Sequence, residues 1–238
     1  MPNPYFRFKQ FTVFHDKCGM KVGTDGVLLG TWADVRNAAK ILDVGTGSGL
    51  IALMLAQRSN SYVKGIDIDQ DAVNQARENF ENSPWGKSLA VEKISLQEFS
   101  ETRSERFDLV VSNPPYFVNS LHNPEEKRSI ARHTSSLTHE ELLLCSKKIL
   151  NETGKICIIL PIKEEEKIEK IATKNGLFCS KKVFVLPNPT SKPKRILLEF
   201  SKIQTNTSVS WMEIDTGERK NYSAQFYSLV KDFYLELK

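Results

Sequence analysis

From residue 40 onward the chain alternates between two patterns of apolar and polar residues. Short runs of apolar or β-branched residues predict strands, and apolar side chains at helical spacing predict amphipathic helices. In residues 71–81, for example, Ala72, Ala76 and Phe80 share one helical face, while Gln, Arg and Glu residues occupy the other positions. Strands are predicted at residues 41–44, 62–68, 89–94, 107–111, 156–160, 182–186 and 196–200, and helices at residues 50–58, 71–81, 138–150 and 164–175.

The order of these elements predicts the fold class. Strands that alternate with helices of ten to fifteen residues are typical of βαβ units and a mostly parallel sheet. Residues 109–111 are apolar throughout, as expected of a strand that is covered on both faces. We therefore predict an α/β protein with a Rossmann-like, doubly wound, seven-stranded and mostly parallel sheet.

Three regions depart from the alternating pattern. Before residue 40, the sequence predicts a short hairpin between Phe6 and Phe14 and an apolar helix at residues 27–33. Residues 112–137 form a long polar connection, and connections of this length are commonly functional. From Ser208 onward we expect a short strand, a turn and a helix at residues 223–235. The expected organisation is one domain over residues 1–238, with an N-terminal extension (1–39), a core (40–203) and a C-terminal strand and helix (204–238).

Composition and charge narrow the class of protein without identifying a function. Of 238 residues, 40% are apolar and 26% charged, which excludes collagen-like, fibrous and disordered proteins. The 33 Lys and Arg residues exceed the 29 Asp and Glu residues by a net charge of +4, which is compatible with a nucleic-acid partner. The four cysteines lack metal-ligand spacing, so we expect no metal site. Because no apolar run approaches the ~20 residues that span a bilayer, and no apolar signal segment begins the chain, we expect a cytoplasmic protein.

The strongest local signal is the sequence DVGTGSG at residues 43–49. A predicted strand ends here in a glycine-rich turn that leads directly into a helix, so that a ligand can lie against bare peptide groups. The third glycine comes one residue earlier than in the dinucleotide fingerprint G-x-G-x-x-G, and the turn suits a nucleoside without bridging phosphates. On its own, the turn is also compatible with a tight connection between a strand and a helix.

A carboxylate follows the next predicted strand. Asp67 lies 24 residues after Asp43, close to the separation of about 20 residues expected for a carboxylate that binds ribose hydroxyls. A carboxylate can accept hydrogen bonds from both hydroxyls. We expect Asp69 and Asp71 instead to stabilise the N-terminus of the following helix. Together, the glycine turn and Asp67 predict a site for a nucleoside cofactor.

The sequence NPPY at residues 113–116 follows another predicted strand. Asn113 offers a side-chain carbonyl, the two prolines hold backbone carbonyls at a set position, and Tyr116 adds an aromatic face. These groups fit an amino group that donates two hydrogen bonds while its ring stacks on the tyrosine. A rigid turn with a half-buried aromatic is the alternative. The position after a central strand, where open α/β sheets bind ligands, favours the functional interpretation.

Together, the DVGTGSG turn, Asp67 and the NPPY loop resemble the class I S-adenosylmethionine-dependent methyltransferases that methylate amino groups. The segment KVGTDGVLLG at residues 21–30 more narrowly resembles the bacterial tRNA-Val adenine-37 N6-methyltransferase family, and the similarity runs through essentially the whole chain. This resemblance implies the class I methyltransferase fold, S-adenosylmethionine as cofactor, and the N6 amine of an adenine in the tRNA anticodon loop as substrate.

The resemblance also implies roles for individual residues. Residues 1–39 would cover the cofactor, with Thr24 and Asp25 closing over its methionine end. Asp67 would hold the ribose, and Ser95 and Leu96 would lie beside the adenine ring of the cofactor, although many relatives have an aspartate at the position of Ser95. The glycine turn would contribute Asp43, Gly45, Thr46, Gly47 and Gly49 to the cofactor site, and the target adenine would be held by Asn113, Pro114, Pro115 and Tyr116.

Basic residues cluster in two places and predict contacts with RNA phosphates. The first cluster follows the NPPY loop and contains Lys127, Arg128 and Arg132. The second flanks the last two core strands and contains Lys192, Lys194 and Arg195, with Lys181 and Lys182 nearby. For each residue, an ordinary solvated surface position is the alternative.

The leading interpretation is a monomeric tRNA adenine N6-methyltransferase. The nearest alternative is the same chemistry on an rRNA guanine or on a protein glutamine. A nicotinamide-dependent oxidoreductase is disfavoured by the glycine spacing and by the lack of a recognisable substrate domain. A non-catalytic RNA-binding scaffold that kept the fold is a further alternative.

Overall fold

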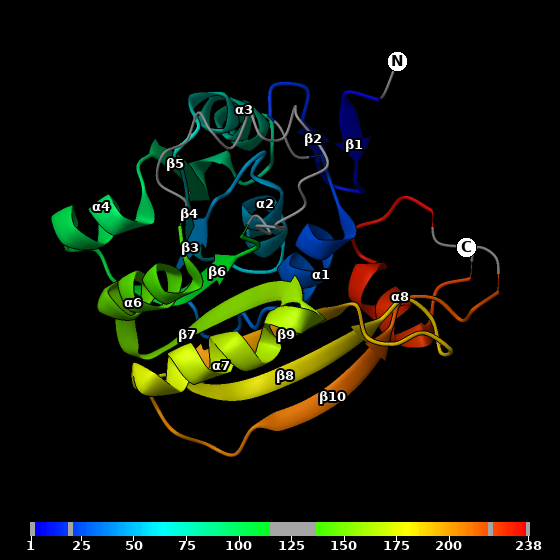
Figure 1. Cartoon of the computed structure of the whole chain (residues 1–238). Coiled ribbons are helices and arrows are strands. Elements are labelled where there is room, and N and C mark those ends of the chain that lie inside the picture. The colour runs from blue at the N-terminus through cyan, green and yellow to red at the C-terminus, as the bar shows by residue number, and fades with distance from the viewer. Residues whose placement is uncertain (1–2, 19–20, 115–136, 219–220, 237–238) are drawn as a thin grey trace, which may run out of the picture.

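A single large sheet forms the centre of the computed structural model, which describes residues 3–18, 21–114, 137–218 and 221–236 (Figure 1). Its strand order is β10-β8-β9-β7-β6-β3-β4-β5. These strands are β3 (Lys40–Val44), β4 (Tyr62–Asp67), β5 (Leu89–Lys93), β6 (Phe107–Ser112), β7 (Leu150–Pro161), β8 (Phe178–Leu186), β9 (Arg195–Ser201) and β10 (Ser208–Glu213). A separate two-stranded antiparallel sheet pairs β1 (Tyr5–Arg7) with β2 (Thr12–Phe14), as the predicted hairpin requires.

The predicted α/β class and the mostly parallel sheet are confirmed. Strands β5, β4, β3, β6 and β7 run parallel to one another, whereas β9 is antiparallel to both β7 and β8. The predicted count of seven strands is wrong, because β10 also joins the sheet by pairing in parallel with β8. The strand itself was expected in the C-terminal segment, but nothing in its sequence indicates which strand it pairs with.

The predicted helices are present, with ends that shift by at most three residues except in the C-terminal helix, which was predicted at residues 223–235 and ends at Val230. The described helices are α1 (Thr24–Trp32), α2 (Leu50–Gln57), α3 (Gln70–Glu81), α4 (Leu96–Thr102), α6 (His139–Ile149), α7 (Glu165–Lys174) and α8 (Ala224–Val230), with short 3-10 helices η1 (Gly86–Ser88) and η2 (Ile162–Glu164). Helix α4 was not predicted, since only Leu96 and Phe99 of its residues are buried and two positions are too few to show a helical period.

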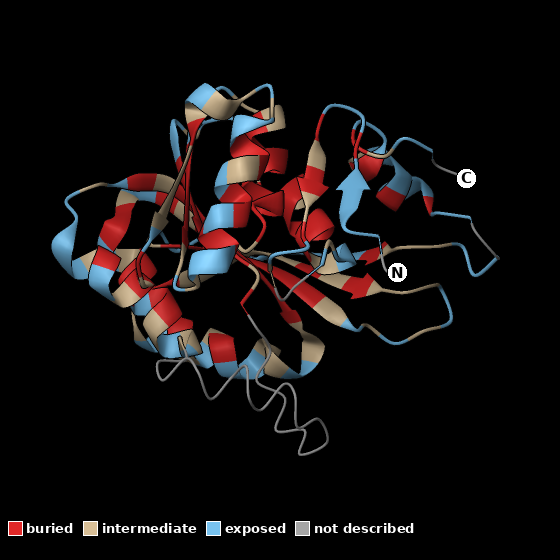
Figure 2. Cartoon of the chain, turned by 90° about the horizontal axis from the view of Figure 1, so that it is seen from above, coloured by how far each residue is buried: buried red, intermediate tan, exposed pale blue. Residues whose placement is uncertain are grey.

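Helices cover both faces of the sheet, so that it is buried between two layers (Figure 2). The core on one face combines residues of α1, α2, α3 and α8, and the core on the other face combines residues of α4, α6 and α7. Alternation along β3 serves both cores, since Ile41 packs into the first and Leu42 into the second. This two-sided burial explains why the central strands lack an alternating polar pattern.

Strand register brings three chain segments to one level at the edge of the sheet. Val44, the last residue of β3, pairs with Ile66 on one side and with Ser112 on the other. The next residues along the three strands are therefore Gly45, Asp67 and Asn113, side by side at the carboxyl ends of β3, β4 and β6. With neighbouring strands about 4.8 Å apart, Asp67 and Asn113 flank the glycine turn at about 5 Å on either side.

Gly49 ends the glycine turn in a conformation and a space that only glycine can occupy. Its φ is +81°, and a Cβ atom there would lie 2.4 Å from the Phe80 ring of α3. Gly47 also has a positive φ, of +55°, but a Cβ atom there would meet no described residue within 4 Å. Alanine variants at the two positions therefore measure separately how much backbone strain and how much overpacking lower the free energy of unfolding.

Substituting Gly49→Ala is expected to lower the free energy of unfolding by about 2–5 kcal/mol, because backbone strain adds to a clash with the Phe80 ring. The matched Gly47→Ala variant is expected to cost only the backbone component of about 1–2 kcal/mol. Chemical denaturation of both variants measures the difference. Equal losses for the two variants would contradict the packing of Gly49 against α3.

Candidate functional site

The glycine turn at residues 45–49 leaves its backbone open to a ligand. The backbone N–H groups of Gly45 and Thr46 donate to the carbonyl of Ile66 at 2.9 and 3.0 Å, which fixes the turn to the end of β4. Both Gly45 and Gly47 have positive φ, and a Cβ atom at either would meet no described residue within 4 Å. The turn is therefore fixed to the end of β4, and among the described residues nothing crowds its two glycines, which suits a nucleoside cofactor that lies against backbone.

Asp43 supports this turn from beneath. Its side chain is fully buried, and Oδ2 accepts hydrogen bonds from Thr46 Oγ1 at 2.7 Å and from the N–H of Ala52 at 3.2 Å. Ala52 lies in the first turn of α2, where N–H groups have no partner within the helix. Burial raises the pKa of Asp43 to about 7. Because the carboxyl is covered, Asp43 can orient a cofactor through the turn that it holds.

Asp67 contacts the same turn from the end of β4. Oδ2 accepts a hydrogen bond from the N–H of Gly47 at 2.9 Å, and Oδ1 accepts one from the N–H of Asp69 at 3.0 Å. Burial raises the pKa of this carboxyl, and the two N–H groups oppose that shift by stabilising its charged form. Each oxygen retains a lone pair, so two ribose hydroxyls can still donate to the group. The predicted helix-capping role of Asp69 is confirmed, since its Oδ1 accepts from the N–H of Asp71 at 2.9 Å.

Ser95 and Leu96 follow closely after Lys93, the residue of β5 that pairs with Asp67, but use their side chains within the fold. The N–H of Ile94 donates to the carbonyl of Asp67 at 3.0 Å, which joins their segment to the end of β4. Ser95 is the N-cap of α4, where its Oγ accepts from the N–H of Glu98 at 3.1 Å, and Leu96 is buried. A cofactor ring beside them would therefore meet chiefly backbone and the start of α4.

The segment that follows β6 lies on the other side of the turn. Ser112 Oγ donates to the carbonyl of Val44 at 2.9 Å, so the end of β6 is tied directly to the end of β3. Asn113 and Pro114 come next at the open edge of the sheet. Pro115 and Tyr116, together with the predicted RNA contacts Lys127, Arg128 and Arg132, lie outside the described residues.

Helix α1 brings Thr24 and Asp25 to the same edge. Gly26 and Gly30 allow a close approach to α2, because Cβ atoms at these positions would lie 2.9 Å from atoms of Leu50 and Met54 respectively. The order of these contacts aligns α1 and α2 in the same direction, so the first turn of α1 lies next to Leu50, which directly follows the glycine turn. Thr24 is exposed there, and Asp25 is half-buried.

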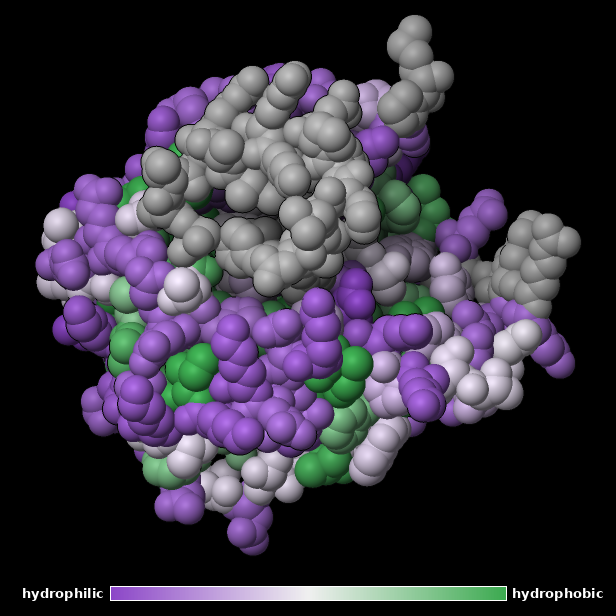
Figure 3. Space-filling model, viewed as in Figure 1, coloured by the Kyte–Doolittle hydropathy of each residue, from purple (hydrophilic) through white to green (hydrophobic). Residues whose placement is uncertain are grey.

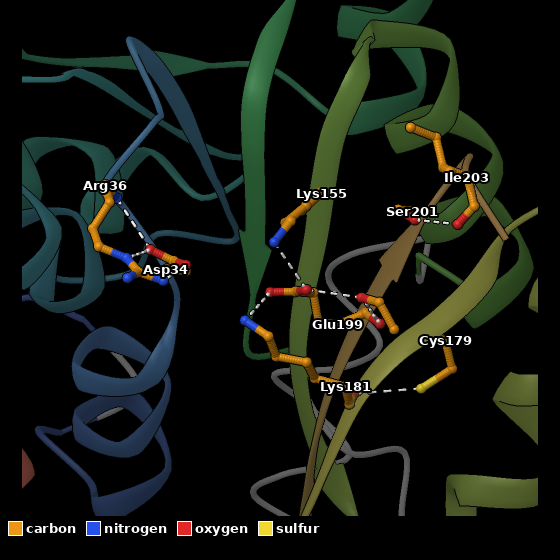
Figure 4. Close-up of polar contacts among 9 residues, drawn as sticks. Asp34, Arg36, Lys155, Cys179, Lys181, Glu199, Ser201 and Ile203 are labelled. Carbon is orange, nitrogen blue, oxygen red and sulfur yellow. Dashed lines mark hydrogen bonds and ion pairs between the residues drawn. The ribbon is translucent and has the colours of Figure 1, made fainter. Parts of the chain in front are cut away.

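The second predicted cluster of basic residues divides into two groups. Lys192 and Lys194 are exposed before β9, whereas Arg195 donates through Nε to Asp25 Oδ2 at 2.8 Å. Lys181 contacts the buried Glu199 at 3.4 Å, in a cluster that Lys155 joins (Figure 4). The remaining lysine, Lys182, pairs with Glu165 and Glu169 on α7, a helix whose surroundings are mostly hydrophilic (Figure 3). Lys192 and Lys194 are thus the described basic residues of this cluster that project freely into solvent.

Asn79 and Gln75 on α3 are site-supporting residues that the sequence interpretation missed. The Asn79 amide nitrogen donates to the carbonyls of Phe14 and Ser48, both at 2.8 Å, and its oxygen accepts from the N–H of Phe14 at 3.0 Å. The Gln75 oxygen accepts from the N–H of Lys17 at 3.1 Å. These buried amides bind the N-terminal segment to α3 and to the glycine turn. Their signal was present, since both are polar residues at helical spacing on an otherwise apolar face.

Metal-binding clusters and membrane-spanning helices are both absent from the part of the chain that the structure describes. No group of three or more His, Cys, Asp or Glu residues among the described residues could hold a metal ion. No described helix is both long and apolar enough to cross a membrane.

Solved structures share the fold at low sequence identity. A predicted O-methyltransferase from Agrobacterium tumefaciens aligns with a TM-score of 0.68 and 18% identity, covering 88% of this chain and 96% of that one. A ribosomal protein L11 methylase from Lactobacillus delbrueckii aligns with a TM-score of 0.54 and 21% identity, covering 75% of this chain and 77% of that one. These likenesses establish the class I methyltransferase fold.

Sequence relatives are much closer. Residues 13–185 match the family model of the methyltransferase small domain. A tRNA1(Val) (adenine(37)-N6)-methyltransferase from Parabacteroides distasonis is 48% identical, with all of both chains covered. The enzyme of the same name from Yersinia enterocolitica is 42% identical, over 97% of this chain and 92% of its own. The chain therefore belongs to the tRNA1(Val) (adenine(37)-N6)-methyltransferase family, within the methyltransferases of the small-domain type.

Proposed function

We propose that this protein transfers a methyl group from S-adenosylmethionine to the N6 amine of adenine 37 in the anticodon loop of tRNA-Val. Family membership supports the reaction, since full-length relatives at 42–48% identity carry this name. The observation that carries the proposal is the strand register. It sets the open glycine turn between Asp67 on one side and Asn113 on the other.

The residues around the turn fit S-adenosylmethionine. Cβ atoms at Gly45 and Gly47 would meet no described residue within 4 Å, so the methionine part can lie against the backbone of the turn. Asp67 is an anchored carboxylate with lone pairs left for ribose hydroxyls. Thr24 and Asp25 would close over the methionine end, and Ser95 and Leu96 would border the adenine ring. When bound, this cofactor supplies an electrophilic methyl group on a sulfonium centre.

On the substrate side, Asn113 and Pro114 would hold the reacting amine. An adenine amine is a poor nucleophile because its lone pair is delocalised into the ring. Hydrogen bonds from its two N–H groups to the Asn113 side-chain carbonyl and the Pro114 backbone carbonyl would favour a pyramidal nitrogen whose lone pair points at the methyl carbon. The nitrogen would form the new N–C bond as the sulfonium S–C bond breaks and leaves a neutral thioether, and the methylated nitrogen would release one proton to solvent. Positioning and electrostatics supply most of the acceleration.

The target base has to leave its stack to reach this position. Extrusion costs least for an unpaired base, such as one in an anticodon loop. Pro115 and Tyr116 continue the substrate loop in the sequence, and Tyr116 would offer the extruded base an aromatic surface. Lys127, Arg128, Arg132, Lys192 and Lys194 would bind RNA phosphates around the site.

The proposed organisation follows from these roles. Residues 1–39 form the cofactor cover, residues 40–203 the catalytic core, and residues 204–238 a C-terminal strand and helix. We propose that the enzyme acts as a monomer in the cytoplasm, where its tRNA substrate is found. Calorimetry with S-adenosylmethionine and with NAD, followed by a methyl-transfer assay on unmodified tRNA-Val, tests the proposal. Binding of NAD alone, or binding of S-adenosylmethionine without methyl transfer, would contradict it.

Removing the charge of Asp67 is expected to weaken cofactor binding. The Asp67→Asn variant should bind S-adenosylmethionine about 10- to 100-fold more weakly, because hydrogen bonds to a charged group contribute about 1.5–3 kcal/mol. Calorimetry measures the affinity. The matched Asp69→Asn variant should bind normally, since Asn caps a helix as well as Asp does. Equal affinities for wild type and Asp67→Asn would remove Asp67 from the cofactor site.

Asn113→Ala is expected to abolish methyl transfer while leaving the affinity for S-adenosylmethionine largely unchanged, because Asn113 would contact the substrate amine alone. Turnover of tRNA and calorimetric titration of the cofactor separate the two effects. Asn82→Ala removes an exposed amide at the end of α3 and serves as the matched control, with normal turnover expected. Near-normal turnover of Asn113→Ala would rule out the proposed role.

Reversing the charges of Lys192 and Lys194 is expected to weaken tRNA binding and to make it less sensitive to salt. Loss of two phosphate contacts should reduce the slope of log affinity against log salt concentration by about 1–2. Lys87→Glu is the control, since this exposed lysine lies in η1 before the start of β5, at the opposite edge of the sheet. An unchanged slope for the Lys192→Glu, Lys194→Glu variant would remove both residues from the interface.

A further inference from the structure

We infer that Arg195 is a positioning residue for the cofactor site, which it serves by fixing Asp25 and the first turn of α1 at the edge of the sheet. This inference deepens the proposed function and rests on it. From the sequence, Arg195, in the basic run before β9, was instead predicted to contact an RNA phosphate. The basis of the inference is the ion pair between Arg195 Nε and Asp25 Oδ2, at 2.8 Å.

The position of Arg195 follows from the sheet. Arg195 is the first residue of β9 and pairs with Pro161, the last residue of β7. Along β7, Pro161 comes three residues after Ile158, which pairs with Ser112 at the end of β6. Arg195 therefore lies at the same edge of the sheet as Asn113, two strands away. Arg195 is therefore close to the proposed site.

The direction of the Arg195 side chain follows from the alternation along β9. Leu197 packs into the core that α1 and α2 form, whereas Ile196 and Leu198 pack into the opposite core. Arg195 has the same parity as Leu197, so it faces α1. Its side chain is 34% exposed and that of Asp25 is 21% exposed, so the pair is partly shielded from solvent. Lys192 and Lys194 are exposed and precede the strand.

The partner of Arg195 belongs to the segment proposed to cover the cofactor. Asp25 lies in the first turn of α1, and the next residue, Gly26, packs closely against Leu50 at the start of α2. Leu50 directly follows the glycine turn. The ion pair thus joins β9 to the start of α1, and Gly26 in turn joins the start of α1 to the start of α2. Without Arg195, the first turn of α1 would lose this ion pair with the sheet edge, while its contact with α2 would remain.

The chemistry of the pair fits positioning better than RNA binding. A guanidinium that already donates to a carboxylate has part of its charge neutralised, which weakens its attraction for a phosphate. Arg195 can still hold Asp25 in one orientation toward a bound ligand. We therefore expect the loss of Arg195 to change the affinity for the cofactor and not the affinity for tRNA.

A double-mutant cycle on Arg195→Gln and Asp25→Asn tests the inference, with S-adenosylmethionine affinity measured by calorimetry in the absence of tRNA. Arg195→Gln is expected to weaken S-adenosylmethionine binding about three- to tenfold, because it removes one charge-assisted hydrogen bond at a partly shielded position. In the Asp25→Asn background, Arg195→Gln should have no further effect, because Arg195 acts through Asp25. Arg195→Lys should restore part of the affinity.

Two controls make the result specific. Lys163→Gln removes an exposed cation in η2, just after β7 at the same edge, and should leave cofactor affinity unchanged. Thermal denaturation of Arg195→Gln without ligand checks that this variant is folded. If Arg195→Gln is unfolded, the cofactor affinity of Arg195→Lys is measured in its place. The tRNA affinity and its salt slope should match wild type for Arg195→Gln.

Three outcomes would overturn the inference. These are unchanged cofactor affinity in Arg195→Gln, equal effects of Arg195→Gln in both backgrounds, or a loss of tRNA affinity with a reduced salt slope. The last outcome would assign Arg195 to the RNA interface. Failure of the wild-type protein to bind S-adenosylmethionine would instead contradict the proposed function, so the two failures are distinguishable.

Discussion

The candidate site depends above all on the register of three adjacent parallel strands. Main-chain hydrogen bonds pair Val44 with Ile66 and with Ser112, and so the glycine turn, Asp67 and Asn113 leave the sheet at one level. A slip of one residue would turn every side chain of a strand to the opposite face. Because both faces are covered by helices, such a slip would exchange the two cores. Burial of apolar side chains in the body of the sheet therefore positions the polar groups at its edge.

Buried polar groups then shape the edge itself. The glycine turn is held by Asp43 from below, by the carbonyl of Ile66 at its start and by Asn79 at Ser48. These contacts leave the positions to which Cβ atoms of Gly45 and Gly47 would project clear of the described residues. The N-terminal segment uses the same supports, since Asn79 also binds Phe14 through both its N–H and its carbonyl. Helix α3 thus holds both the glycine turn and the N-terminal segment that is proposed to cover the cofactor.

Much of this arrangement could be predicted from local sequence. The alternation of strands and helices predicted the fold class, and the spacing between the glycine turn and Asp67 predicted their proximity, because consecutive βα units place their strand ends together. Other features depend on contacts between distant residues. In the sequence, nothing distinguishes Arg195 from the other basic residues of its run, because its partner Asp25 is 170 residues away. The pairing of β10 with β8 is likewise set by tertiary packing. Ser95 was predicted beside a cofactor ring, and its use as the cap of α4 was hidden because α4 is too short to show a period.

The central claim is that this arrangement methylates one adenine of one tRNA. Mass spectrometry of tRNA nucleosides from cells with and without the protein, with the modified position mapped by sequencing of nuclease fragments, tests it most directly. We expect N6-methyladenosine at position 37 of tRNA-Val to disappear when the protein is absent and to return when it is supplied. An unchanged level at that position, or loss of a methyl group from a different base or from rRNA, would contradict the claim.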